Sequence, residues 1–345
     1  MDEVQLAKKD LERLTAHTEL LYNHTKSREE LIQAFAPGGP FANVCGMYRH
    51  FGGARSIRIS GRFDPELVRA LPDSLKFIVH NGSGYDQLDI PALTERGIQV
   101  ANVPTVVNEA TADTALFLLL GALRQFPRAI GQMQAGKFNS QFSFRDASDP
   151  EGLTLGIVGA GGIGRTLARK AAHALGMHIV YHNRTRLSEE LEMQGMPEGK
   201  RMEYALSLDS LLGQSDVVSL HCPLTPQTHH LIGAAQLARM PSHAILINTA
   251  RGPIVDEAAL VDALDRGVIA GAGLDVYEKE PEIHPGLMRL STSKALLLPH
   301  VGTLTLQTQT DMEAVCLRNL EHGLQTGRLL YTVKEQEGLG LCAQI

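Results

Sequence analysis

The chain has 345 residues, of which 43% are apolar and 20% charged, and its formal net charge is −6 at pH 7. This length exceeds one ordinary hydrophobic core, so the sequence predicts a globular protein of two domains. The acidic balance and the lack of a basic run argue against nucleic acid or an anionic membrane as a partner. The acidic start is unlike an export leader, and no apolar run approaches about 18 residues, so we expect a cytoplasmic protein.

Residues 1–107 are expected to form the first part of a small α/β domain. A periodic segment over 1–22 and a helix capped by Ser27 come first. Strands are then predicted from apolar runs at 44–48, 57–60, 75–79 and 99–102.

Ser83 and Gly84 lie in the segment 80–86, directly after one of these strands. Open α/β sheets bind ligands at the carboxyl ends of their strands, so the N–H groups of this glycine-rich turn are candidates for holding an anion. A tight turn into a helix beginning near Asp89 accounts for the same residues equally well.

An apolar helix over 108–123 is predicted to carry the chain into a second domain, residues 108–305. Predicted strands at 216–221, 244–248, 270–276 and 295–298 alternate there with helices, which is typical of a Rossmann-type parallel sheet wound on both faces. An amphipathic helix over 313–324 is expected to return the chain, so residues 306–345 belong with the first domain.

A glycine turn within residues 153–184 is the most informative feature. An apolar strand over 153–158 enters a GxGxxG hexad, and a helical pattern and a second strand at 178–182 follow. The glycines allow a tight turn, approach of the backbone to a pyrophosphate, and close packing of helix on strand. The predicted dinucleotide-binding residues are Gly159, Ala160, Gly161, Gly162, Ile163 and Gly164.

The residues after the second strand indicate which dinucleotide binds. Sites that prefer NAD place an acid about 20 residues beyond the glycines, where it accepts hydrogen bonds from the ribose 2′-OH. This chain instead has a set suited to a 2′-phosphate, so we expect NADP(H). NAD(H) stays possible, because the arginines can be solvated loop charges and the acids at 189–190 can reach the ribose. The candidate residues are Asn183, Arg184, Thr185 and Arg186.

Three polar residues follow the late strands of the second domain and are expected to share one crevice: Arg251, Glu280 and His300. Reduction of a 2-oxo acid needs a cation for its carboxylate and a proton donor for its oxygen. Arg251 suits the first role through its planar fork, and His300 suits the second because imidazole exchanges protons near neutral pH. Glu280 beside the imidazole would favour its protonated form. Each residue taken alone can equally be structural.

The cysteines provide no sign of a metal site. They are far apart in the sequence and lack CxxC spacing, so we expect reduced thiols and no bound metal. The four are Cys45, Cys222, Cys316 and Cys342.

Segments 248–252, 273–281 and 299–302 resemble the three signature segments of the D-isomer-specific 2-hydroxyacid dehydrogenases. The similarity covers roughly residues 20–333, and it implies that residues 1–107 are the first part of a flavodoxin-like α/β domain that binds the substrate. It implies an NAD(P)-dependent 2-oxo acid reductase in which Arg251 binds the carboxylate and carbonyl, Glu280 holds the histidine, and His300 is the acid/base. It also implies that Ser83 and Gly84 bind the carboxylate, and that the enzyme is a homodimer built on the nucleotide domains. Further cofactor contacts implied by the family are Cys222, Pro223, Thr249, Asp275, His300 and Gly302.

Two departures from the family pattern carry expectations of their own. Segments 173–177 and 228–232 are similar to fungal D-mandelate dehydrogenases, but Asn183 and Arg184 resemble the turn of NADPH-linked glyoxylate/hydroxypyruvate reductases. Members commonly open with an apolar strand, whereas residues 1–14 are amphipathic, so one strand of the small sheet is expected to be missing. Either the start codon is misassigned or the small domain is less stable.

Alternatives remain open for substrate and for function. A glyoxylate/hydroxypyruvate reductase is one, and a non-catalytic, dinucleotide-sensing regulator of the corepressor kind is another. The loops at 47–52 and 141–145 are expected to set the preference for the substrate side chain.

Overall fold

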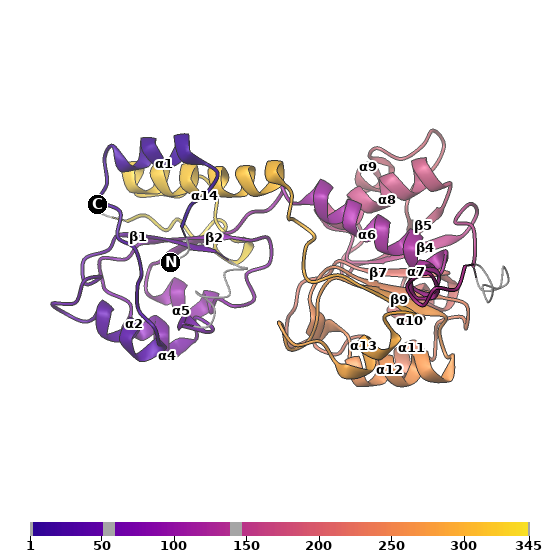
Figure 1. The fold of residues 1–345 in the computed structure, drawn as a ribbon. Coiled ribbons are helices and arrows are strands. Elements are labelled where there is room, and N and C mark those ends of the chain that lie inside the picture. The colour runs from indigo at the N-terminus through magenta and orange to yellow at the C-terminus, as the bar shows by residue number, and fades with distance from the viewer. Residues whose placement is uncertain (1–2, 51–58, 139–146, 344–345) are drawn as a thin grey trace. The chain divides into compact units, whose positions relative to one another are not determined.

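The computed structural model describes residues 3–50, 59–138 and 147–343, and the chain divides into two compact units (Figure 1). Unit 1 comprises Met1–Val107 and Thr305–Ile345, and unit 2 comprises Asn108–Leu304. Unit 1 contains a three-stranded parallel sheet and unit 2 a seven-stranded parallel sheet. The predicted class, two α/β domains with a doubly wound larger one, is confirmed.

In unit 1 the strand order is β1-β2-β3, with β1 at one edge. Buried apolar residues of α2, α4 and α5 pack with strand residues into one core. Helix α14 lies against β1 and β2, and α1 packs on α14. The strands are β1 (Gly46–His50), β2 (Phe77–Asn81) and β3 (Gln99–Ala101), and the helices are α1 (Lys8–Thr15), α2 (Arg28–Phe35), α4 (Pro65–Ala70), α5 (Ile90–Glu95) and α14 (Leu306–Thr326).

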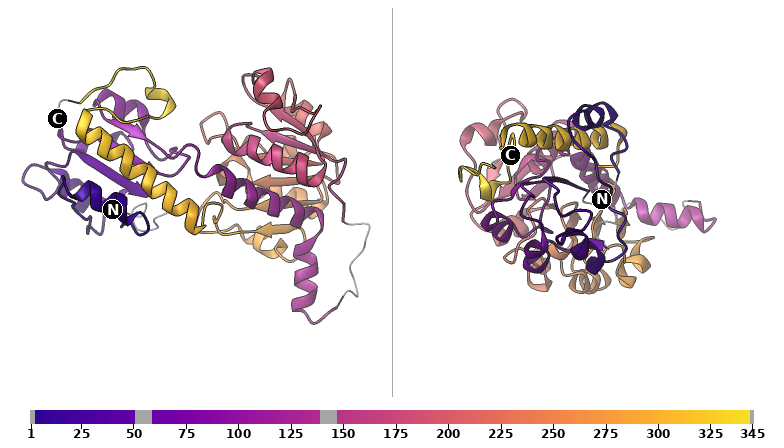
Figure 2. Two further views of the ribbon diagram at one scale, coloured as in Figure 1. Left: turned by 90° about the horizontal axis from the view of Figure 1, so that it is seen from above. Right: turned by 90° about the vertical axis from the view of Figure 1, so that its left-hand side faces the viewer.

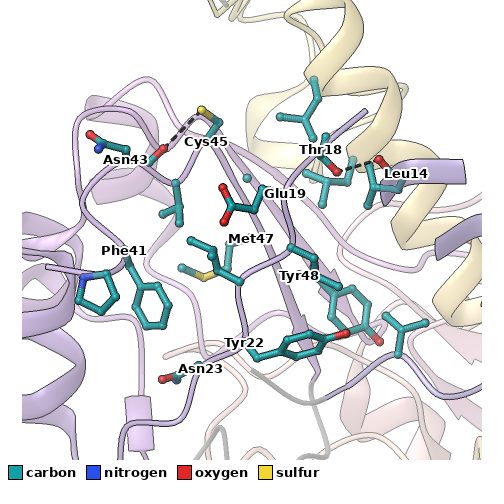
Figure 3. A pocket seen from close by; sticks show the side chains of 18 of the residues that line it. Leu14, Thr18, Glu19, Tyr22, Asn23, Phe41, Asn43, Cys45, Met47 and Tyr48 are labelled. Carbon is teal, nitrogen blue, oxygen red and sulfur yellow. Dashed lines mark hydrogen bonds between the residues drawn. The ribbon is translucent and has the colours of Figure 1, made fainter. Parts of the chain in front are cut away.

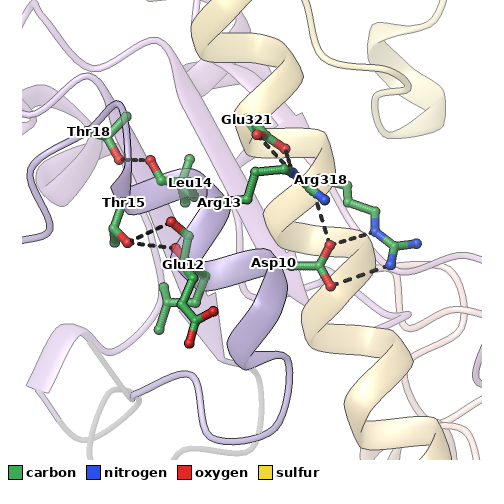
Figure 4. Close-up of polar contacts among 9 residues, drawn as sticks. Asp10, Glu12, Arg13, Leu14, Thr15, Thr18, Arg318 and Glu321 are labelled. Carbon is green, nitrogen blue, oxygen red and sulfur yellow. Dashed lines mark hydrogen bonds and ion pairs between the residues drawn. The ribbon is translucent and has the colours of Figure 1, made fainter.

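Charged side chains fasten α1 to α14 (Figure 4). Arg318 Nε donates to Asp10 Oδ1 at 2.8 Å, and Arg13 Nε donates to Glu321 Oε2 at 2.7 Å. The buried Glu313 carboxylate accepts the N–H groups of residues 5, 6 and 7, so a side chain of α14 serves the amino end of α1.

In unit 2 the strand order is β10-β9-β8-β7-β4-β5-β6. Strands β5 and β6 follow on one side of β4 and strands β7 to β10 on the other, so the switch point of the sheet lies between β4 and β7. Two apolar clusters cover the sheet, one supplied by α10 to α13 and the other by α6 and α8. The strands are β4 (Thr154–Val158), β5 (His178–His182), β6 (Glu203–Tyr204), β7 (Val217–Leu220), β8 (Ile245–Asn248), β9 (Gly271–Leu274) and β10 (Ala295–Leu297). The helices are α6 (Asn108–Leu123), α7 (Phe126–Gln134), α8 (Gly162–Leu175), α9 (Glu189–Met193), α10 (Leu208–Gln214), α11 (Ala234–Leu237), α12 (Glu257–Arg266) and α13 (Pro285–Leu290).

Several predicted elements differ from the structure. The strand expected at 57–60 is wrong in its second half, because Ile59 and Ser60 are helical, and its first half lies outside the described residues. Helix α14 begins at Leu306 and not at 313, since Thr305 accepts from the Thr308 N–H and starts the helix within a polar run. Among the described helices, none is both long and apolar enough to cross a bilayer.

Candidate active site

In the turn after β4, local packing leaves no room for a side chain at two of the glycines, whereas a third has open space beside it. Gly159 has φ of 97°, and a Cβ there would lie 2.6 Å from the Cys222 nitrogen. A Cβ on Gly164 would lie 2.5 Å from the Gly159 oxygen. Gly161 differs, because its φ is −77° and a Cβ there would meet no described atom within 4 Å. Space is thus left open beside Gly161, as the approach of a pyrophosphate to the backbone would require.

The amino end of α8 faces this turn without a side-chain cap. The N-cap is Gly161, which has no side chain to accept a hydrogen bond from the helix. The first N–H groups of this 14-residue helix also lack intrahelical partners. Asn183 Oδ1 accepts the Ala160 N–H at 2.8 Å and ties the end of β5 to the turn. A helix end of this kind favours an anion.

The two arginines after β5 lie in different environments. Arg186 pairs with Glu192 through two hydrogen bonds of 2.7 and 2.9 Å, and this guanidinium holds the pKa of the fully buried Glu192 carboxyl down at about 2. Arg184 is exposed and forms no ion pair with any described residue. Thr185 is also exposed. Arg186 therefore has a structural partner, and Arg184 is the arginine that remains available for a phosphate.

Two further predicted cofactor residues fit a bound nucleotide. Thr249 is 8% exposed, and within the described residues its Oγ1 has no hydrogen-bond partner, which a ligand would supply. The Cys222 backbone abuts Gly159, and burial raises the pKa of the Cys222 thiol to about 11, which disfavours the thiolate. Pro223 is exposed next to it.

The loop after β8 positions Arg251 through the side chain of Asn248. Asn248 is buried, its Nδ2 donates to the Arg251 oxygen at 2.9 Å, and its Oδ1 accepts the Ala250 N–H at 3.0 Å. A Cβ on Gly252 would lie 1.8 Å from the Tyr277 carbonyl carbon. The backbone beside Arg251 therefore lies directly against the loop that leads to Glu280.

Glu280 and His300 are in direct contact. Glu280 Oε1 accepts the Tyr277 N–H at 3.0 Å, and Oε2 lies 2.7 Å from His300 Nδ1. Burial acts to raise the pKa of Glu280, but the hydrogen bond and charge of His300, together with the charge of Arg251, outweigh it and lower that pKa. The carboxylate is thus ionised and is placed to accept a proton on Nδ1 of His300.

A second carboxylate shapes the turn that carries His300. Asp275 is 1% exposed, and its two oxygens accept the N–H groups of Val301 and Gly302, each at 2.8 Å. Burial raises the pKa of Asp275, although those two N–H groups and the charge of His300 oppose it. His300 itself has a positive φ of 56°, so the turn holds it in a conformation that side chains rarely adopt.

Sequence reasoning did not assign the supporting roles of Asn248, Asp275 and Glu257. The buried Glu257 accepts the Glu278 N–H at 2.9 Å and fixes the loop before Glu280. The usable signal is a polar side chain at the end of an otherwise apolar strand, which Asn248 and Asp275 both present.

The predicted anion turn lies in unit 1 after β2. Asn102 Nδ2 donates to the Ser83 oxygen at 2.6 Å, and His80 Nε2 lies 3.0 Å from the Gly84 oxygen. The Ser83 C=O and the Gly84 N–H belong to the same planar trans peptide and point in opposite directions, so the Gly84 N–H points away from Asn102. Of the predicted specificity loops, residues 51–52 and 141–145 lie outside the described residues.

A doubly wound sheet, an open glycine turn and an imidazole–carboxylate pair after adjacent strands define a dinucleotide-dependent oxidoreductase. The cysteines are free, and no cluster of metal-binding side chains occurs within the described ranges. Residues 116–302 match the family model of the D-isomer specific 2-hydroxyacid dehydrogenase, NAD binding domain. The chain belongs to this family and is an NAD(P)-dependent 2-hydroxyacid dehydrogenase, or 2-oxo acid reductase. The predicted resemblance is confirmed.

Solved structures agree with this assignment. A glyoxylate reductase from Paecilomyes thermophila is 43% identical with a TM-score of 0.89, covering 97% of both chains. The apo D-mandelate dehydrogenase of Rhodotorula graminis is 30% identical with a TM-score of 0.86, covering 96% of this chain and 95% of that one. An NADPH-dependent glyoxylate/hydroxypyruvate reductase from Sinorhizobium meliloti, in complex with NADP and malonate, is 31% identical with a TM-score of 0.78, covering 99% and 97%.

Proposed function

We propose that the chain is an NADPH-preferring reductase that converts 2-oxo acids to D-2-hydroxy acids. Residues 108–305 would bind the nucleotide, and residues 1–107 with 306–345 the substrate. The observation that supports the proposal most directly is the 2.7 Å contact of His300 Nδ1 with Glu280. The charge of Arg251 also helps to lower the pKa of this carboxyl group.

The chain's own residues then have distinct tasks. When bound, the nicotinamide supplies the hydride for the carbonyl carbon. Glu280 holds Nδ1–H and stabilises the protonated imidazole, so His300 gives its Nε2 proton to the carbonyl oxygen as negative charge develops there. The Arg251 fork pairs with the substrate carboxylate and carbonyl, and the Ser83 and Gly84 turn supplies N–H groups to the same carboxylate.

The nucleotide would be bound where the structure leaves open space or polar groups without protein partners. The glycine turn and the amino end of α8 suit the pyrophosphate, and the Thr249 hydroxyl, which has no partner in the described part of the chain, offers a further contact. Cys222, Pro223, Asp275 and Gly302 complete the proposed cofactor set.

Replacing Arg184 by Ala should reduce the preference for NADPH over NADH. Loss of a charge-assisted hydrogen bond costs about 1.5 kcal/mol at an exposed position, so kcat/KM with NADPH should fall roughly tenfold while that with NADH stays unchanged. The steady-state oxidation of each cofactor measures this. Arg239→Ala, which removes an exposed arginine elsewhere in unit 2, is the control and should alter neither value. A wild-type preference for NADH would refute the role given to Arg184.

The proposed homodimer has a candidate surface in α7. This helix stands away from the sheet of unit 2 (Figure 2), and it exposes Phe126, Ile130 and Met133 by 44%, 45% and 66%. Phe117 of α6 is 53% exposed as well. An exposed apolar helix of this kind is typical of a subunit interface.

Ile130→Glu with Met133→Glu should convert a dimer to a monomer, because two buried charges would lack partners. Light scattering after size exclusion measures the mass. Leu206→Glu, at a side chain 85% exposed elsewhere in unit 2, should leave the dimer intact. A wild-type chain that is monomeric at micromolar concentration would contradict the assignment of this surface.

The substrate is the least constrained part of the proposal. The similar structures carry the names of glyoxylate, glyoxylate/hydroxypyruvate and mandelate enzymes, which differ greatly in the size of the side chain. Glyoxylate/hydroxypyruvate reduction is the second candidate, because Asn183 and Arg184 resemble the turn of the NADPH-linked enzymes. Glyoxylate, pyruvate, 2-oxoisocaproate, phenylpyruvate and benzoylformate tested with NADPH would rank the candidates by kcat/KM.

A further inference from the structure

Unit 1 contains a pocket of about 610 Å³ that mainly apolar side chains line (Figure 3). Glu19 directs its carboxylate into this space, but Glu19 is itself exposed. The described lining therefore specifies no class of ligand. The contacts around His230 in unit 2 are more informative, because each of them has a defined partner.

The backbone of His230 lies against the loop that follows Arg251. The His230 N–H donates to the Pro253 oxygen at 2.8 Å. Two residues further on, the Ile232 N–H donates to the Ile254 oxygen at 3.0 Å. The two segments therefore run side by side just beyond Arg251.

The side chain of His230 reaches a second loop, which leads to Glu280. His230 Nε2 contacts Glu278 Oε1, and the two side chains are 40% and 21% exposed, so water reaches this pair only in part. The Glu278 N–H donates to the buried Glu257 at 2.9 Å, and the Tyr277 N–H donates to Glu280 Oε1 at 3.0 Å. One residue, His230, thus joins the loop beyond Arg251 to the loop of Glu280.

Two features hold the imidazole of His230 in place. Its φ is 50°, a left-handed conformation that histidine and asparagine adopt more readily than most residues. The ring also stacks on that of His229, with centroids 4.1 Å apart and planes inclined by 26°. The backbone and the neighbouring ring therefore fix the direction in which the imidazole meets Glu278.

We propose that His230 is a positioning residue, which holds Glu278 and thereby keeps the Glu280 carboxylate against His300 Nδ1. Glu280 follows Glu278 by only two residues, so a shift of this loop moves the carboxylate with it. A hydrogen bond weakens steeply as its distance and angle depart from the optimum, and catalysis is sensitive to displacements of this size. The inference rests on the proposed function, because it concerns the pair that would transfer the proton.

Three substitutions and one control separate this contact from the rest of the fold. His230→Asn removes the contact but keeps the backbone, because asparagine also tolerates a positive φ while its shorter side chain does not reach Glu278. Glu278→Ala removes the other partner, and Glu278→Gln keeps a hydrogen-bond acceptor. The control is His243→Asn, which removes an imidazole paired with Asp216 at the amino ends of the strands.

Amide hydrogen exchange reports on Glu280 without any turnover, because this carboxylate accepts the Tyr277 N–H. We expect the Tyr277 amide to exchange at least about threefold faster in His230→Asn and Glu278→Ala, as loss of a partly exposed ion pair implies. Glu278→Gln and His243→Asn should keep the wild-type rate. NMR spectroscopy resolves the rate of this amide, and thermal unfolding verifies that each variant is folded. A wild-type rate in His230→Asn would overturn the proposal.

Kinetics test the consequence for the reaction, with a 2-oxo acid that the wild type reduces. His230→Asn and Glu278→Ala should each lower kcat about three- to tenfold while KM changes little. In a Glu280→Ala background, His230→Asn should have no further effect, because the group that it positions is gone. A wild-type kcat in His230→Asn, or an undiminished loss in that background, would overturn the proposal. If the wild type reduced no 2-oxo acid, the proposed function would fail, and the exchange of the Tyr277 amide would still decide whether His230 positions Glu280.

Discussion

Replacing His300 by Ala should lower kcat by about 10² to 10⁴, the usual contribution of a general acid. Glu280 lies 2.7 Å from Nδ1 of the imidazole. Truncation to alanine removes the proposed proton donor and leaves Glu280 without this partner. Stopped-flow and steady-state oxidation of NADPH with a 2-oxo acid would measure kcat, while the affinity for NADPH should stay within a few-fold of the wild type.

A matched control exists within the same domain. His243 Nε2 lies 2.7 Å from Asp216 Oδ1, which is the same kind of imidazole–carboxylate pair, but it precedes strands β7 and β8 and so lies at the amino ends of the sheet. His243→Ala should therefore leave kcat unchanged. Near-normal kcat in His300→Ala, or an equal loss in both variants, would rule out the role proposed for His300.

Replacing Arg251 by Gln should produce the second large loss, in kcat/KM. Removing one member of a desolvated charge pair costs about 2 to 5 kcal/mol, which corresponds to a decrease of roughly 30-fold to several thousand-fold. Arg251→Lys should fall between the Gln variant and the wild type, because a point charge attracts the carboxylate but lacks the planar fork. The 2-oxo acid dependence of the initial rate gives kcat/KM for each variant.

The control for Arg251 is Arg289→Gln, which removes a surface arginine that pairs with Asp265. It should keep the wild-type kcat/KM. If Arg251→Gln also kept it, the carboxylate would have to be held by other groups, and the proposed substrate orientation would be contradicted.

The regular parts of the fold could be predicted from the sequence because they depend on local patterns. The apolar run at 108–123 coincides with α6 (Asn108–Leu123), and the strand predicted at 244–248 begins one residue before β8 (Ile245–Asn248). Helix α7 and strand β6 were not predicted, since α7 exposes much of its apolar face and β6 has only two residues.

The chemistry-bearing side chains were predictable for a similar reason. Parallel strands bring their carboxyl ends to one edge, so Glu280 and His300 were expected to meet, and they do. The partner of Arg186 was not predictable, because Glu192 reaches it only through the fold of the intervening loop, where its buried carboxylate also accepts the Tyr181 hydroxyl. The supporting hydrogen bonds of Asn248 and Asp275 depend on tertiary structure in the same way.

Chiral analysis of the product that the wild-type chain forms from a 2-oxo acid and NADPH tests the central claim most directly. The account predicts steady consumption of NADPH, with one D-2-hydroxy acid formed for each NADPH oxidised. Binding of NADPH without turnover of any 2-oxo acid would instead indicate a dinucleotide-sensing regulator, and an L-2-hydroxy acid product would contradict the proposed placement of His300 and Arg251.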